Sequence, residues 1–168
     1  MQWIYLLTGT IMGVISVYHL FTHKHRKSTQ DYVIYRLNDR KKIPTGSKAY
    51  KRSLIAAYAV LFLSIFLFVE VFNNFFNATI LFLIIFILGT YVLVTLDRIF
   101  EIQGEALIFA GYHARWGKIR SVQWGKRKKN KSQLIMELGK GQKIKTYIRN
   151  DEADELENIL SNYVYFEK

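Results

Sequence analysis

The sequence of 168 residues contains no cysteine, which excludes disulfide bonds, thiolate metal sites and a cysteine nucleophile. Catalytic signatures are missing as well. There is no G-x-S-x-G nucleophile elbow, no H-E-x-x-H zinc motif and no phosphate-binding glycine loop of the Walker type. We therefore expect a protein that is not an enzyme and that carries no cofactor.

Charged side chains are missing from two long stretches of the chain. Residues 1–23 contain no Lys, Arg, Asp or Glu, and Glu70 is the sole one between residues 53 and 96. In the second stretch Phe, Leu, Ile and Val cover every side, and about 20 helical residues span the roughly 30 Å hydrocarbon core of a bilayer. We predict one transmembrane helix in residues 1–22 and a transmembrane helical hairpin in residues 53–96, with its break at residues 73–77.

The first helix has no basic start and no small-residue cleavage site, so we expect it to be retained rather than removed as a signal peptide. Gly9 and Gly13 form a G-x-x-x-G pattern, which allows close approach of another helix, including one from a second copy of the chain. The alternative is that these glycines reflect only the high glycine content of membrane helices.

Residues 23–52 carry ten Lys or Arg residues against Asp31 and Asp39. A short loop with this imbalance remains in the cytoplasm. We therefore predict a multi-pass protein of the cell membrane, with the N-terminus and the turn at 73–77 outside and everything after residue 96 inside. Within the loop, an apolar set either lies on the membrane surface or pairs with the C-terminal domain. This set consists of Tyr32, Ile34 and Leu37.

Residues 97–168 change to short alternating segments separated by Gly, Asn and Lys, which predicts a small antiparallel β domain. The five candidate strands are residues 98–103, 106–112, 119–125, 133–138 and 143–148. An amphipathic helix follows in residues 151–163, capped by Asn150 or Asp151, with Leu156, Ile159, Leu160 and Tyr163 on one face. The fold class is then an α+β membrane protein with three transmembrane helices, a cytoplasmic β domain and a C-terminal helix.

Three segments of this domain carry a family resemblance: residues 102–108, residues 114–119 with the Trp-x-x-Ile piece at Trp116, and residues 122–124. With the final helix, they resemble the bacterial pleckstrin-homology-like (PH-like) domains on small membrane proteins of Gram-positive bacteria. The resemblance implies a seven-stranded barrel, two strands more than the pattern predicts. Members of that group have been linked to self-immunity against membrane-active bacteriocins, which implies a bacteriocin peptide or another protein as partner.

The densest charge cluster is predicted at a turn between two strands, and we call it the basic hairpin. It consists of Lys126, Arg127, Lys128, Lys129 and Lys131. Contact with the anionic inner leaflet or a partner is one interpretation, and a solvated turn that merely obeys the positive-inside bias is the other. The net charge of +11 does not indicate nucleic acid binding here, because the motifs of nucleic-acid-binding domains are missing.

His19 and His23 lie four residues apart, with His25 close by, so two imidazoles could share a helix face as metal or haem ligands. No second histidine-bearing helix exists in the membrane region, and His113 lies in the C-terminal domain. We therefore predict no metal site and interpret these histidines as interfacial side chains.

Glu70 is the one acid within the apolar segments, and an intramembrane carboxylate is a functional hypothesis by default. Three interpretations of Glu70 are open. It attracts a cationic peptide from outside, it pairs within the helical bundle, or it anchors its helix at the outer interface.

Two functions follow from these patterns. The leading hypothesis is a non-enzymatic membrane protein whose cytoplasmic PH-like domain binds a partner or the inner leaflet and which protects or organises the cell envelope, with bacteriocin self-immunity as its most concrete form. The alternative is a small transporter or an accessory subunit of one. A transport path needs several polar groups within the membrane, and this sequence offers few.

Overall fold

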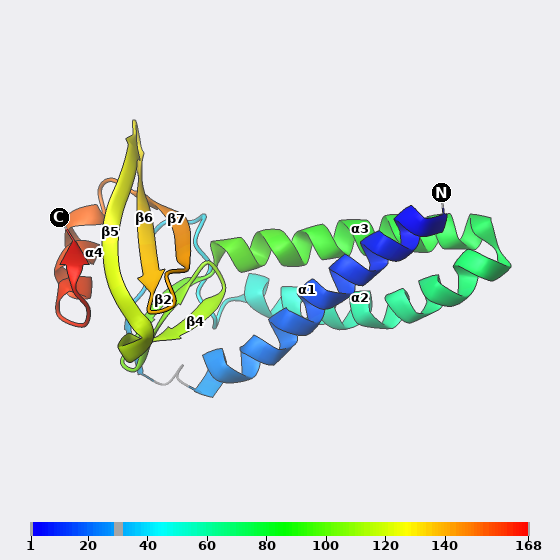
Figure 1. Cartoon of the computed structure of the whole chain (residues 1–168), viewed down its shortest axis with the longest axis horizontal. Coiled ribbons are helices and arrows are strands. Elements are labelled where there is room, and N and C mark those ends of the chain that lie inside the picture. Colours follow the sequence, from blue (N-terminus) through cyan, green and yellow to red (C-terminus); the bar gives the residue numbers. More distant parts are fainter. Residues whose placement is uncertain (1, 29–31, 168) are drawn as a thin grey trace. The chain divides into compact units, whose positions relative to one another are not determined.

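The structure is a computed structural model that describes residues 2–28 and 32–167. The chain divides into two compact units, which are shown in Figure 1. The helical unit comprises Met1–Lys27 and Thr45–Leu96, and the β unit comprises Ser28–Pro44 and Asp97–Lys168. The β unit is therefore assembled from two separate segments of the sequence.

Three long helices dominate the first part of the chain: α1 (Gln2–Ser28), α2 (Lys48–Asn73) and α3 (Phe75–Arg98). All three are long and apolar enough to cross a membrane. Helix α2 begins after Ser47, whose hydroxyl accepts the Tyr50 N–H and so satisfies one of the free donors of the first turn.

The break between α2 and α3 is a single residue, Asn74, and the predicted five-residue break at 73–77 is wrong. The Asn74 N–H donates to the Glu70 carbonyl, and its side-chain oxygen accepts the N–H groups of Phe76 and Asn77. One residue thus closes α2 through its backbone N–H and caps α3 through its side chain, which leaves no need for a longer loop.

Small residues allow the three helices to approach closely. A Cβ atom added to Gly9 would lie 2.8 Å from the Leu67 side chain of α2, and one added to Gly89 would lie 2.6 Å from the Met12 sulfur of α1. At Gly13 the nearest such neighbour is 3.8 Å away. Close helix approach at the G-x-x-x-G pattern therefore occurs within one chain, and pairing of two copies through it stays a prediction.

The β unit contains eight strands in two four-stranded sheets, within the described residues. These strands are β1 (Val33–Tyr35), β2 (Phe100–Gln103), β3 (Ala106–Phe109), β4 (Tyr112–Arg115), β5 (Ile119–Lys128), β6 (Lys131–Leu138), β7 (Lys143–Arg149) and β8 (Phe166–Glu167). One sheet has the order β1-β2-β3-β4 and the other β7-β6-β5-β8, with β8 parallel to β5 and all other pairs antiparallel. A short 3-10 helix, η2 (Trp116–Lys118), joins the two sheets.

The prediction of five strands was therefore too low, for three local reasons. The predicted strand 106–112 splits into β3 and β4, because Ala110 and Gly111 adopt positive φ angles of 48° and 82° and turn the chain. Strand β1 comes from the loop before α2, where Val33 pairs with Gln103 of β2. This pairing decides between the two alternatives for that loop in favour of the β domain, and β8 adds a further strand near the C-terminus.

The core of the β unit combines residues of both sheets with helix α4 (Ala153–Ser161). Leu156 and Leu160 are fully buried, as the amphipathic pattern predicts, whereas Tyr163 is 39% exposed and stacks on Trp116. The predicted cap at Asn150 or Asp151 is wrong, because α4 begins after Glu152 and makes no side-chain cap.

Candidate anion-binding surface

The basic hairpin lies where β5 passes into β6. Residues 126–130 are exposed and Lys131 is half-buried, and the register pairs Lys128 with Lys131 across the turn. No Asp or Glu occurs between residues 120 and 131. The Lys128 ammonium also lies 5.0 Å from the centre of the Tyr147 ring on β7, at cation–π distance. The predicted turn thus concentrates positive charge, and its own segment supplies no carboxylate to neutralise it.

Asn150 holds this hairpin in place. Its side-chain amide donates to the carbonyls of Lys128 and Lys129, both at 3.2 Å, and its side-chain oxygen accepts the Ser132 hydroxyl at 2.7 Å. Its backbone N–H donates to the Asn130 carbonyl. Four hydrogen bonds therefore attach the turn to the segment between β7 and α4, and the residue predicted to cap a helix instead orders the basic hairpin.

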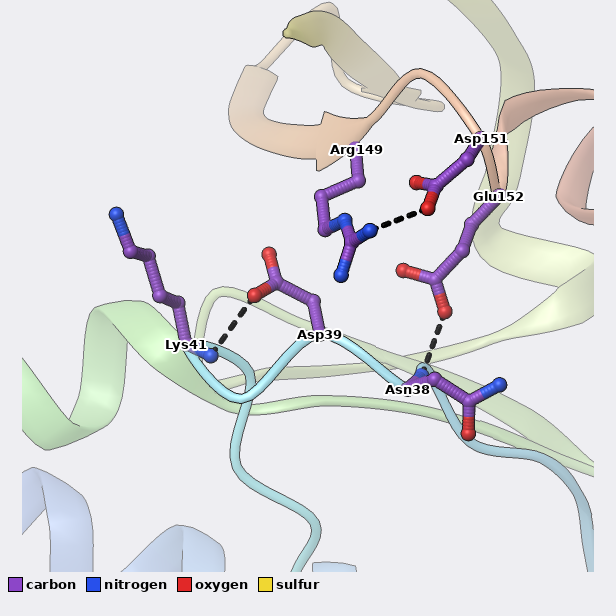
Figure 2. Close-up of polar contacts among 6 residues, drawn as sticks. All are labelled: Asn38, Asp39, Lys41, Arg149, Asp151 and Glu152. Atoms are coloured by element: carbon purple, nitrogen blue, oxygen red, sulfur yellow. Dashed lines mark hydrogen bonds and ion pairs between the residues drawn. The ribbon is translucent and has the colours of Figure 1, made fainter.

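A recess of about 510 Å³ adjoins the hairpin, and we call it the basic recess. It is lined by Asp39, Lys41, Lys129, Asn130, Lys131, Arg149, Asn150 and Asp151. Figure 2 shows how its carboxylates are used: Asp39 accepts the backbone N–H of Lys41, and Asp151 pairs with Arg149. The lining carries four basic side chains, of which Arg149 pairs with Asp151, against two carboxylates, and this excess of positive charge favours an anionic group.

The segment from β1 to Lys42, which supplies Asp39 and Lys41 to the basic recess, contacts Glu152, α4 and β7. The Asn38 N–H donates to Glu152 at 2.6 Å, and the Tyr35 hydroxyl donates to Glu155 at 3.0 Å. Burial, with the neighbouring Glu155 carboxylate, raises the pKa of Tyr35 to about 12. The Lys42 ammonium donates to the Thr146 hydroxyl on β7.

Glu70 is half-buried near the end of α2, with its carboxylate 3.5 Å from the Asn77 side-chain amide. Glu70 and Asn77 are the two polar residues in the lining of a groove of about 440 Å³ between α2 and α3. The groove is lined by Phe62, Leu63, Phe66, Glu70, Asn77, Ile80 and Leu81. The three interpretations of Glu70 all stay open, because this geometry suits an anchor, a pair within a bundle and a cationic ligand.

The histidines of α1 belong to a buried polar network that sequence reasoning missed. Arg26 donates to His19 Nδ1 at 3.1 Å, and because arginine only donates, His19 carries its proton on Nε2 and donates to the Ser53 hydroxyl at 2.9 Å. His23 Nδ1 lies 2.9 Å from the Tyr50 hydroxyl. The spacing of residues 19, 23 and 26 on one helix face was the available signal.

The same network bears on metal binding. Both ring nitrogens of His19 are engaged by protein partners, His25 is exposed and His113 lies on β4. Among the residues that the structure describes, no group of three His, Cys, Asp or Glu side chains could hold a metal ion. His19 therefore joins α1 to α2 through its hydrogen bond with Ser53, while Arg26 engages its other ring nitrogen.

Comparison of the chain with protein-family models, curated proteins and solved structures gives no match. Its class therefore follows from its own features. Three helices of spanning length and composition indicate a multi-pass membrane protein, and they are followed by a two-sheet β unit with a C-terminal helix.

Proposed function

We propose that this chain is a non-enzymatic integral membrane protein whose β unit is a cytoplasmic, PH-like binding domain that the basic hairpin attaches to the anionic inner leaflet. The observation that carries the proposal is the basic hairpin: five basic side chains on a turn ordered by Asn150, with no acid between residues 120 and 131. β2 begins at Phe100, two residues after α3 ends at Arg98. Such a short connection keeps the β unit within reach of the membrane into which α3 inserts.

The magnitudes favour contact over a freely solvated turn. Each basic residue near an anionic leaflet contributes on the order of 1 kcal/mol, so the basic hairpin contributes about 5 kcal/mol if all its side chains reach the surface. Tethering by α3 removes most of the entropic cost of association, because the surface is always nearby. The contact depends on charge rather than on a shaped pocket and shows little preference among headgroups of equal charge.

A reporter on the hairpin tests this proposal in the full chain. Asn130→Cys, labelled with bimane in this cysteine-free protein, is reconstituted in vesicles that contain a lipid with a nitroxide headgroup. Quenching should be strong with phosphatidylglycerol and weak with phosphatidylcholine alone. It should fall as salt shortens the Debye length from about 10 Å at 0.1 M to about 3 Å at 1 M.

Two variants separate charge from shape. Replacing Lys126, Arg127, Lys128 and Lys129 with Gln, the hairpin-Gln variant, should abolish the salt-sensitive quenching. A matched control in which the three lysines of this set become Arg keeps the charge and should keep the quenching. Equal quenching in the hairpin-Gln variant or in neutral vesicles would reduce the basic hairpin to a solvated turn and overturn the proposal.

The cellular role that fits such a protein is protection or organisation of the cell envelope, with bacteriocin self-immunity as its most concrete form. The support is Glu70, which the proposed orientation puts near the outer surface, where cationic membrane-active peptides arrive. Cells that lack the gene should become more sensitive to such peptides, and the wild-type gene should restore resistance where Glu70→Gln does not. Unchanged sensitivity of the deletion strain would remove the immunity role.

The alternative is a small transporter or an accessory subunit of one, and the His19 network favours it because polar groups are buried between α1 and α2. These groups lie within residues 16–26 and 50–53, however, and apart from Ser64 and Thr95 the remaining buried side chains of α2 and α3 are apolar. A network confined to one end of the helices does not provide a continuous polar path, so the binding role remains the stronger proposal.

A further inference from the structure

A second opening in the β unit is distinct from the basic recess, and we call it the apolar cup. It has a volume of about 600 Å³ and lies between β4, η2, the start of β5 and the turn from β6 to β7. Small-molecule sites in proteins range over about 300–1,000 Å³, so the apolar cup has the size of a ligand site.

The floor of the apolar cup is the hydrophobic core of the β unit. Ala114 and Ile119 belong to the buried core cluster, and Leu138 packs against it. Strands β4 and β5 are not paired, since β4 ends one sheet while β5 lies inside the other. The core is therefore reached from outside through a gap between the two sheets, where apolar surface would otherwise face water.

Glycine keeps the mouth of this gap open. A Cβ atom added to Gly117 would meet nothing within 4 Å, and one added to Gly139, in the turn from β6 to β7, would meet only the Lys118 carbonyl oxygen, at 3.8 Å. Gly117 has no positive φ angle, so a larger side chain could stand there without backbone strain. The opening is thus a space that a single substitution can fill.

The residues that line the apolar cup carry positive charge only: Lys118, Arg120 and Lys140 lie among them, and no Asp or Glu does. Lys118 and Lys140 form no ion pair with any residue that the structure describes, whereas Arg120 lies 3.3 Å from Glu137. An apolar floor beneath a cationic rim is complementary to an amphiphile with an anionic head.

We propose that the apolar cup binds one molecule of an anionic phospholipid from the membrane, with its phosphate against Lys118 and Lys140 and part of an acyl chain on Ala114, Ile119 and Leu138. The bilayer is the source because β2 follows α3 after one residue, Ile99, so lipid is the amphiphile most abundant near the β unit. This inference rests on the proposed insertion of the helices in a membrane, but not on the basic hairpin. It differs from the surface contact in requiring a shaped site.

Photocrosslinking in the full chain tests the apolar cup. The protein is reconstituted with phosphatidylglycerol that carries a diazirine on one acyl chain, and labelled peptides are mapped by mass spectrometry. Label should appear in residues 112–120 and 138–142 as well as in the helices. The helices provide an internal standard, so the measured quantity is the ratio of label in the β unit to label in the helices.

Filling the space should remove the label from the apolar cup. Gly117→Trp should reduce the ratio to background, and Lys118→Gln or Lys140→Gln should each reduce it about fivefold, as expected for about 1 kcal/mol per basic residue. Lys145→Gln, an exposed lysine of β7 outside the apolar cup, is the matched control and should leave the ratio unchanged. No label in these peptides of the wild type, or a ratio unchanged by Gly117→Trp, would overturn the inference.

Two further arms separate this inference from the alternatives. The hairpin-Gln variant should lose the salt-sensitive bimane quenching and keep the cup label, whereas Gly117→Trp should do the reverse, so the two proposals fail independently. Excess dodecanoate should not displace the lipid label. Complete displacement by this soluble fatty acid, together with label that does not depend on the phosphatidylglycerol content, would assign the apolar cup to a soluble amphiphile.

Discussion

Lys42 allows a sharp test of the packing between the loop before α2 and the second sheet. Its ammonium group donates to the Thr146 hydroxyl of β7 and is half-buried. Burial lowers the pKa of Lys42 from 10.5 to about 8, although Asp97 and Asp39 partly offset this effect. The folded protein therefore holds a proton on Lys42 less tightly than the unfolded chain does.

The sign of the pH dependence follows from that difference. Below pH 8 the folded state bears the full cost of the buried charge, and between pH 8 and 10.5 the unfolded chain keeps a proton that the folded protein has lost. The free energy of unfolding should therefore rise with pH in this window, by at most about 3 kcal/mol. Tyr35, with a pKa raised to about 12, acts in the opposite direction above about pH 10, where the unfolded chain loses the phenol proton first.

The rise is measured by urea unfolding of the full chain in detergent between pH 7.5 and 9.5. In a Trp3→Phe background the remaining tryptophans, Trp116 and Trp124, both lie in the β unit, so their fluorescence follows its unfolding. Lys42→Met should remove the rise. At pH 7.5 it should also stabilise the β unit by about 2 kcal/mol, since the relieved charge outweighs the lost hydrogen bond of about 1 kcal/mol.

The control is Lys145→Met, which changes an exposed lysine on the same strand as Thr146 and should leave the pH dependence as in the wild type. Equal slopes in the wild type and Lys42→Met would show that Lys42 is not buried against β7. The attachment of the loop to the second sheet would then be refuted.

Three other predictions address topology, core and hairpin. Single cysteines at Gln2, Asn74 and Asn130 should react with an impermeant thiol reagent from outside, outside and inside respectively, and labelling of Asn130 in intact cells would reverse the proposed orientation. Leu160→Asp puts a charge on the buried face of α4 and should abolish cooperative unfolding of the β unit, so an unchanged urea transition would mean that α4 does not pack there. Asn150→Ala removes three side-chain hydrogen bonds from the hairpin and should speed amide exchange at residues 128–132 with little loss of global stability, whereas unchanged exchange would show that the turn is held by other contacts.

The helices could be predicted from the sequence because lipid demands an absence of charge over a fixed length, and this signal is local. The capping role of Asn74 was less accessible, since any of the Asn residues at 73, 74 and 77 could have taken it. The turn at Ala110 was missed because alanine seldom adopts a positive φ angle, and the apolar pattern continues through it.

The basic hairpin was predictable because its charges are consecutive in the sequence, but its surroundings were not. Asp39 and Lys41 reach the basic recess from a loop about 90 residues earlier in the chain. The apolar cup depends on a gap between two sheets, and no local pattern reports which strands remain unpaired. A site whose residues come from distant segments can be predicted only when the pairing of the strands is already known.

The position of β1 also changes what counts as the β domain. A fragment starting at residue 97 would lack the strand that pairs with β2, the hydrogen bond from Asn38 to Glu152 and the hydrogen bond from Tyr35 to Glu155 of α4. It would also expose the β2 edge, which favours aggregation. The segment Ser28–Pro44 lies between α1 and α2 in the sequence but belongs to the β unit. Residues 97–168 alone are therefore not the complete β unit, because one strand of its first sheet comes from the segment that precedes α2.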